Sequence, residues 1–159
     1  MFVGGCFGLL LGVDLYSSLV SSLMGVIGGF VPDIDLRFKH RKTLHNIFSL
    51  IALTMIVYSA LLYAAKYAYL DPVNAYRFSL AFASGMALHI LLDSTTKRGV
   101  YILFPFSNRR LRIPIFKSNS VWANGFGISI GLFFLYLWLR QLDIDYLVKK
   151  AISFLSLVS

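Results

Sequence analysis

Long stretches without a charged side chain constrain this chain more than any other feature. Residues 47–65 and 118–139 contain no Asp, Glu, Lys or Arg, and 58% of all residues are hydrophobic. About 20 apolar residues in a helix cross the hydrocarbon core of a bilayer. Lipid cannot satisfy open backbone groups, so the stretches must be helical. The sequence therefore predicts an all-α integral membrane protein.

The hydrophobic pattern divides the 159 residues into about four transmembrane helices within a single membrane domain. The expected spans are 2–31, 45–66, 77–96 and 118–140. The first span contains Asp14, so it is either one long helix or a short helix to Val13 followed by a span from Leu15. In residues 143–159, apolar positions recur at helical spacing, which indicates a C-terminal amphipathic helix on the membrane or on a partner.

The distribution of basic residues predicts the orientation of the helices. The net charge is +8, and the Lys and Arg residues gather at the ends of the apolar stretches. Two basic loops, 32–46 and 97–117, are separated by two spans, so both lie on one side, which the positive-inside rule makes cytoplasmic. We expect a multi-pass protein of the cell (inner) membrane, with anionic membrane lipids rather than nucleic acid as partners. The first apolar run is expected to be retained rather than cleaved as a signal peptide.

Candidate metal ligands are few in this sequence. The single cysteine, Cys6, excludes an intrachain disulfide and a thiolate cluster, and we interpret it as a small apolar residue. All seven acidic residues are aspartates. The predicted topology brings all three histidines and three aspartates to the cytoplasmic ends of the first three spans. These residues are Asp33, Asp35, His40, His45, His89 and Asp93.

The spacing of these residues predicts how they are presented. His89 and Asp93 are four residues apart, so they share one face of a helix. Pro32 disfavours a helix at Val31, and we expect a non-helical turn from Asp33. In an extended backbone, Asp33 and Asp35 would point the same way.

Nitrogen and carboxylate ligands without cysteine suit zinc, manganese or iron. Such an ion lowers the pKa of a bound water to about 7, which generates a nucleophile at neutral pH. Arg41, Lys42 and Arg98 lie beside the ligands in the sequence and can hold an anionic phosphate oxygen. The pattern therefore favours one or two divalent metal ions beside an anion-binding group.

The ordered motifs of residues 28–114 resemble those of a known family. They are "GGFVPDID", "HRKTLHN", "LHILLDSTTKRG" and "FPFSNRRLRIP". They resemble the YdjM family of small membrane-bound proteins described as metal-dependent hydrolases. Asn46 stands where serine is usual in that family. A Thr-His pair that its members usually carry near the N-terminus is absent from the printed sequence, which leaves the number of ions at one or two.

The resemblance implies a distant similarity to zinc-dependent phospholipase C and P1-type nucleases, all-helical enzymes in which a metal-activated water attacks a phosphoester. By position it makes Asp33, His45, His89 and Asp93 the ligands. It makes Asp35 and His40 further ligands or residues that contact the ligands.

We therefore expect hydrolysis at the cytoplasmic membrane face, in which Asp35 or His40 completes the metal shell or acts as general base, and Arg41 and Arg98 steady the phosphate. A lipid or isoprenoid phosphate is the expected substrate, because the site would open at headgroup depth.

Two other functions fit the same residues. The cluster can be a structural metal site or a hydrogen-bonded polar knot in a protein without enzymatic activity. It can also belong to a small metal or proton carrier, since buried Asp and His pairs serve transport. The absence of charge in residues 47–65 and 118–139 argues against a carrier.

Overall fold

The computed structural model describes residues 1–34, 43–68, 71–113, 115 and 121–142, and in these residues it is all-helical. The five helices are α1 (Phe2–Leu9), α2 (Leu15–Ile34), α3 (Ile47–Ala68), α4 (Pro72–Ser94) and α5 (Val121–Gln141). The described residues contain no β-strand, although Val100 and Leu111 form an isolated antiparallel bridge. The prediction of an all-α membrane bundle is confirmed.

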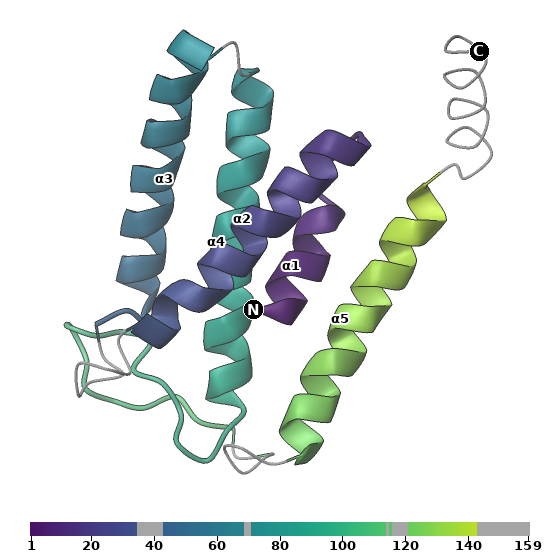
Figure 1. The fold of residues 1–159 in the computed structure, drawn as a ribbon. Helices are drawn as coiled ribbons and strands as arrows, with labels where there is room; N and C mark the ends of the chain where they lie inside the picture. The colour runs from purple at the N-terminus through teal and green to yellow at the C-terminus, as the bar shows by residue number, and fades with distance from the viewer. Residues whose placement is uncertain (35–42, 69–70, 114, 116–120, 143–159) are drawn as a thin grey trace, which may run out of the picture.

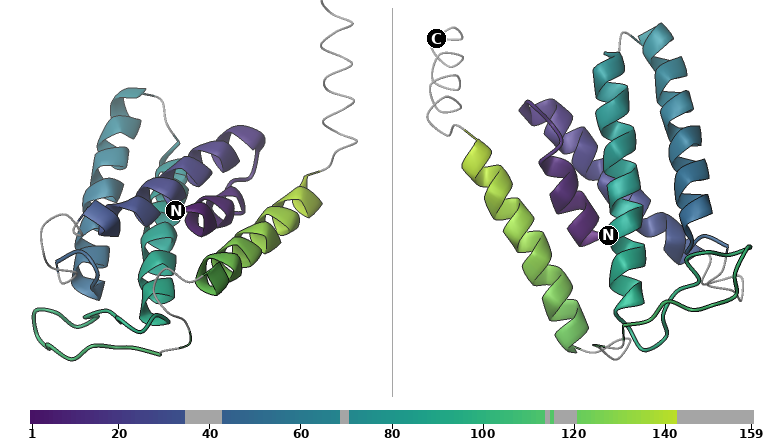
Figure 2. Two further views of the ribbon diagram at one scale, coloured as in Figure 1. Left: turned by 60° about the horizontal axis from the view of Figure 1, so that its bottom comes forward. Right: turned by 180° about the vertical axis from the view of Figure 1, so that it is seen from behind.

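α2 crosses α4 obliquely, as Figure 1 shows, and packs on both α4 and α1. α3 runs beside α4 in the opposite direction, and α1 lies between α2 and α5 (Figure 2). α5 joins the bundle through α1, where the rings of Phe7 and Phe134 lie 5.1 Å apart, edge to face. The short α1 thus connects the last long helix to the rest of the molecule.

Three helices among the described residues are long and apolar enough to cross a membrane: α2, α3 up to Tyr67, and α4. α3 exposes large apolar side chains, including Ile51, Met55 and Ile56, as a lipid-facing helix does. α5 has 21 residues, which span about 31 Å at the rise of an α-helix. That length suffices for a crossing, and a fourth span stays a prediction. The predicted amphipathic helix at 143–159 lies outside the described residues.

The first hydrophobic stretch forms two helices, a short one before Asp14 and a long one from Leu15. This is one of the two arrangements that the sequence allows. Asp14 separates the two helices by capping α2. Its Oδ1 accepts a hydrogen bond from the backbone N–H of Ser17 at 2.8 Å, and Ser17 Oγ accepts one from the N–H of Asp14 at 3.2 Å. This reciprocal pair satisfies backbone donors that a helix start leaves open. α2 therefore starts at Leu15 because of Asp14.

The predicted turn at Asp33 is wrong, because α2 continues through Pro32 to Ile34. A proline within a helix removes one backbone hydrogen bond, here to the carbonyl of Gly28. Only two residues of α2 follow Pro32, so the loss affects the last turn alone. Pro32 is buried in the bundle, and its packing supports this last turn. Asp33 therefore projects from a helix, and Asp35 lies outside the described residues.

Glycines bring the backbones of α1, α2 and α4 into direct contact. A Cβ on Gly85 of α4 would lie 2.0 Å from the carbonyl oxygen of Gly25 in α2, and one on Gly25 would lie 2.2 Å from the oxygen of Gly4 in α1. A Cβ on Gly28 would lie 2.0 Å from the oxygen of Phe82 in α4. Small residues allow such close approach between membrane helices. These contacts fix how far along α4 the end of α2 lies.

Candidate metal centre

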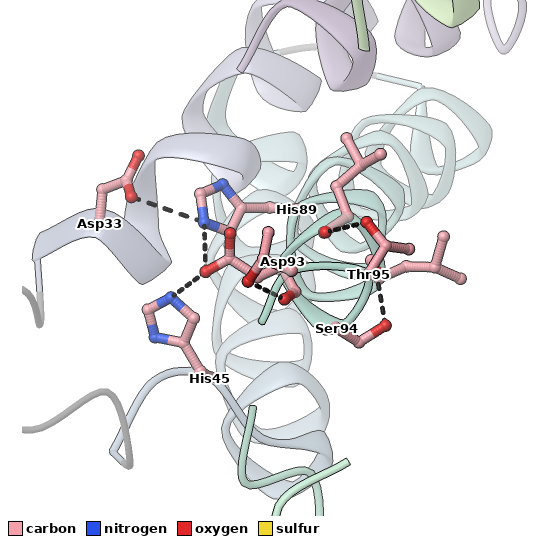
Figure 3. A network of polar contacts seen from close by, with 9 residues as sticks. Asp33, His45, His89, Asp93, Ser94 and Thr95 are labelled. Atoms are coloured by element: carbon pink, nitrogen blue, oxygen red, sulfur yellow. Dashed lines mark hydrogen bonds and ion pairs between the residues drawn. The ribbon is translucent and has the colours of Figure 1, made fainter. Parts of the chain in front are cut away.

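Four ionisable side chains from three parts of the chain meet at one end of the bundle (Figure 3). Asp33 comes from the last turn of α2, and His45 precedes the first residue of α3 by two positions. His89 and Asp93 come from the last turns of α4. All four are among the residues that the sequence proposes as ligands. We refer to them below as the His/Asp cluster.

The distances within the His/Asp cluster are short and nearly uniform. Asp93 Oδ2 lies 3.5 Å from His45 Nε2 and 3.9 Å from His89 Nε2. Asp33 Oδ1 lies 3.5 Å from His89 Nε2. The two imidazole rings meet at an angle of 65°, with centroids 5.6 Å apart. One carboxylate oxygen of Asp93 thus approaches both histidines, and His89 approaches both aspartates.

Three ring nitrogens of the two histidines are buried without a hydrogen bond in the described part of the chain. His45 is fully buried, and 13% of the His89 side chain is exposed. Neither nitrogen of His45, nor Nε2 of His89, has a hydrogen-bond partner within the described part of the chain. Leaving a buried polar group unsatisfied costs about 1–3 kcal/mol. The Nε2 atoms of both histidines lie beside the carboxylates, and together they call for a ligand that accepts electron pairs from nitrogen.

A divalent metal ion fits these donors. One atom each from His45, His89 and Asp93 can be chosen so that the three lie within 4.8 Å of one another. Ligands of a tetrahedral zinc at its usual bond lengths lie about 3.4 Å apart. The separations of 3.5 and 3.9 Å in the cluster are close to that value. A His–Asp pair without a metal ion would form a charge-assisted hydrogen bond of about 2.8 Å. The separations in the cluster are longer than that.

Local structure holds each ligand in place. His89 and Asp93 share a face of α4 by their spacing, and the contact of Gly28 with Phe82 sets the place of Asp33. His45 is held by the start of α3. There Asn46 Oδ1 accepts a hydrogen bond from the N–H of Ser49 at 2.8 Å, and its amide donates to the carbonyl of Thr43 at 2.7 Å.

Asn46 is a positioning residue that the sequence reasoning missed. In the sequence motif this residue is distinctive only as a replacement for serine. Serine and asparagine are both strong helix N-caps, and that shared preference was the available signal.

The remaining proposed site residues lie elsewhere or outside the described part of the chain. Arg98 is exposed, five residues beyond Asp93, and within the described residues it forms no hydrogen bond or ion pair with the His/Asp cluster. Asp35, His40 and Arg41 lie outside the described residues, as does Lys42.

The comparison with known families decides which group of proteins this chain is part of. The family model described as "YdjM inner membrane protein" matches residues 1–158. The chain belongs to the YdjM family. This membership confirms the resemblance seen in the motifs, and together with the three apolar helices it places the protein in a membrane. A search of curated proteins found no significant match, and neither did a search of solved structures.

Proposed function

We propose that this YdjM family member is a membrane-bound metal-dependent hydrolase that cleaves a phosphoester. The observation that carries the proposal is a pair of buried imidazole nitrogens, Nε2 of His45 and Nε2 of His89. Both lack a hydrogen bond within the described part of the chain, and both lie 3.5–3.9 Å from carboxylate oxygens of Asp33 or Asp93. A purely structural hydrogen-bonded knot would satisfy those nitrogens, because buried polar groups in folded proteins almost always have partners.

His45, His89, Asp33 and Asp93 would hold the metal. A divalent ion such as zinc supplies Lewis acidity and a water that is nucleophilic near neutral pH. The two carboxylates offset the charge of the ion, and the two imidazoles bind it as neutral donors. The resemblance makes Asp35 and His40 further ligands or residues that contact the ligands. The hydrolase hypothesis adds that one of them acts as general base, and these roles stay predictions.

The exposure of the ligands indicates the side from which substrate enters. Asp33 and Asp93 are 29% and 25% exposed, whereas His45 is fully buried. Substrate therefore approaches past the carboxylates, and His45 closes the inner wall. A ligand set that is open on one side is typical of catalytic rather than structural metal sites.

The depth of the site favours a lipid or isoprenoid phosphate as substrate. The ligands lie at or beside the ends of α2, α3 and α4, where headgroups meet the hydrocarbon core. Basic side chains, including Lys97 and Arg98, follow α4 at this end. By the positive-inside rule this end faces the cytoplasm. Arg98, which is exposed on the surface, would steady the phosphate together with Arg41.

The test is hydrolysis by the purified protein of bis(p-nitrophenyl) phosphate and of phospholipids in mixed micelles. We expect activity that a chelator abolishes and a divalent ion restores, and that His89→Ala reduces at least about 100-fold, as losses of metal-site residues do. The matched control is Asp71→Ala. Asp71 caps α4 at its other end by accepting a hydrogen bond from Val73, so its loss weakens the same helix but leaves the ligands in place. Equal activity in His89→Ala and wild type would overturn the proposal.

A structural metal site is the second candidate, and the complete burial of His45 favours it. It predicts bound metal and a loss of stability in His89→Ala, but no hydrolysis of either substrate. A carrier would instead move the metal across vesicle membranes. The same preparations therefore distinguish the three functions.

A further inference from the structure

The segment that follows α4 has a defined structure and is held against the helix bundle. In residues 97–113, which we call the bridged loop, the backbones of Val100 and Leu111 exchange two hydrogen bonds of 3.0 and 2.8 Å. Val100 is fully buried against Phe82, Met86 and Ile90 of α4. These contacts fix the base of the loop against the bundle.

Further hydrogen bonds tie the bridged loop to the ends of two helices. The N–H of Ile113 donates to the carbonyl of Ser94, the last residue of α4, at 2.8 Å. The N–H of Ile47, the first residue of α3, donates to the carbonyl of Ile102 at 3.0 Å. The loop therefore spreads across the end of the bundle beneath α3, as Figures 1 and 2 show.

The charge of the bridged loop is entirely positive. It contains five basic residues and no acidic residue. All five basic side chains are exposed. They are Lys97, Arg98, Arg109, Arg110 and Arg112. The guanidinium of Arg110 lies on the ring of Tyr101, 4.8 Å from its centroid, and its Nε donates to the tyrosine hydroxyl at 2.5 Å.

Large apolar side chains are exposed between these charges. Leu103 is 53%, Ile113 53% and Phe106 82% exposed. The ring of Phe106 also touches that of Phe48 in the first turn of α3, with centroids 4.9 Å apart. Exposed apolar and basic side chains on one element are typical of segments that lie in the boundary between headgroups and acyl chains. Arg and Lys then reach the phosphates while their stems stay in apolar surroundings.

From this arrangement we propose that the bridged loop is an anionic-lipid binding element. It lies in the headgroup layer of the membrane that α2, α3 and α4 cross. Phe106 and its apolar neighbours enter the upper acyl region, and the arginines bind lipid phosphates. Five positive charges without a carboxylate complement an anionic headgroup layer. The proposal does not depend on hydrolysis. None of the loop side chains belongs to the His/Asp cluster, and Arg98, to which the proposed hydrolase also gives a role, is not needed for the test below.

The experiment places a fluorescent reporter at the tip of the loop. Phe106→Trp is introduced into the full chain, with Trp122 and Trp138 replaced by phenylalanine. The protein is reconstituted into equimolar phosphatidylcholine and phosphatidylglycerol. Bromine, which quenches tryptophan, is carried on the acyl chains of either one lipid or the other. Because the overall composition stays constant, the ratio of the two quenching constants measures which headgroup gathers at the loop.

We expect stronger quenching from brominated phosphatidylglycerol, and a preference that declines as salt is raised. The double substitution Arg109→Gln with Arg112→Gln should reduce the preference roughly threefold or more. The control is Lys66→Gln with Arg77→Gln, which removes the same charge near the junction of α3 and α4, at the opposite end of the bundle. It should leave the preference unchanged.

Three results would overturn the proposal. Equal quenching by the two brominated lipids would show that the loop does not select anionic headgroups. Absence of quenching by either lipid would place the side chain at position 106 in water. That result is expected of a loop that binds a soluble partner. An equal effect of both double substitutions would show that the preference for anionic lipid depends on the overall charge of the protein and not on the loop. The first two comparisons use the reporter protein without any arginine substitution, so they do not depend on whether the arginine variants fold.

Discussion

Gly28 in α2 lies so close to Phe82 in α4 that a Cβ at position 28 would be 2.0 Å from the carbonyl oxygen of Phe82. The obstacle is backbone, which cannot rotate away as a side chain can. Five residues further along α2 and seven residues further along α4, Asp33 and His89 approach to 3.5 Å. The closeness of the two helices and the geometry of the His/Asp cluster therefore depend on the same contact.

Gly28→Ala is expected to separate α2 from α4 and to displace Asp33 from His89. Overpacking of this kind costs about 1–3 kcal/mol, so the midpoint of thermal unfolding in detergent should fall and divalent metal affinity should weaken. Gly125→Ala in α5 is the control, because a Cβ at that position would meet no described atom within 4 Å outside the adjoining backbone of its own helix. Equal behaviour of the two variants would show that the helix contact does not set the site.

Asn46 is expected to matter through the position of His45. Asn46→Ala removes the cap of α3 and should cost about 1 kcal/mol of stability. It should also weaken metal binding, since His45 immediately precedes the cap. Asn46→Ser retains a capping oxygen and should restore both properties, which are read by thermal unfolding and metal titration. Metal affinity that is the same in the alanine and serine variants would argue against a positioning role.

Asp14 predicts a pH dependence of stability that arises outside the membrane-spanning segments. The backbone N–H of Ser17, which donates to its carboxylate, holds the pKa of Asp14 below its ordinary value. A group whose folded-state pKa is depressed stabilises the fold above its unfolded-state pKa, about 4 for aspartate. That contribution is lost as the pH falls through the folded-state pKa.

The comparison that isolates Asp14 is wild type against Asp14→Asn, which keeps a capping oxygen but does not ionise. The difference in unfolding midpoint should be constant above about pH 5 and should shrink below about pH 4. A difference that stays constant throughout this range, or that widens on acidification, would contradict the assignment.

The proximity of the cluster could be predicted from the sequence, because hydropathy and loop charge place Asp33, His45 and the α4 pair at one membrane face. The helical spacing of His89 and Asp93 adds their shared orientation. These inferences need only local periodicity and topology. They require no knowledge of which helix touches which.

The features that the sequence reasoning missed depend on contacts between distant residues. The helical conformation at Pro32 is supported by burial in the bundle. The rule that a proline disfavours a helix at the preceding residue takes no account of such tertiary contacts. The bridge between Val100 and Leu111 joins positions eleven residues apart across a loop without strand periodicity. Close contacts among glycines of three helices likewise become visible only when the helices are packed.

The central claim is that the buried histidines hold a divalent metal ion. Its most direct test is the metal content of the purified protein, measured by mass spectrometry after exhaustive dialysis, for wild type and for His45→Ala with His89→Ala. Asp71→Ala provides the control for a weakened α4. We predict one or two tightly bound ions in wild type and in Asp71→Ala, and none in the double histidine variant. Wild-type protein without metal, or a double variant that retains as much metal as wild type, would contradict the claim.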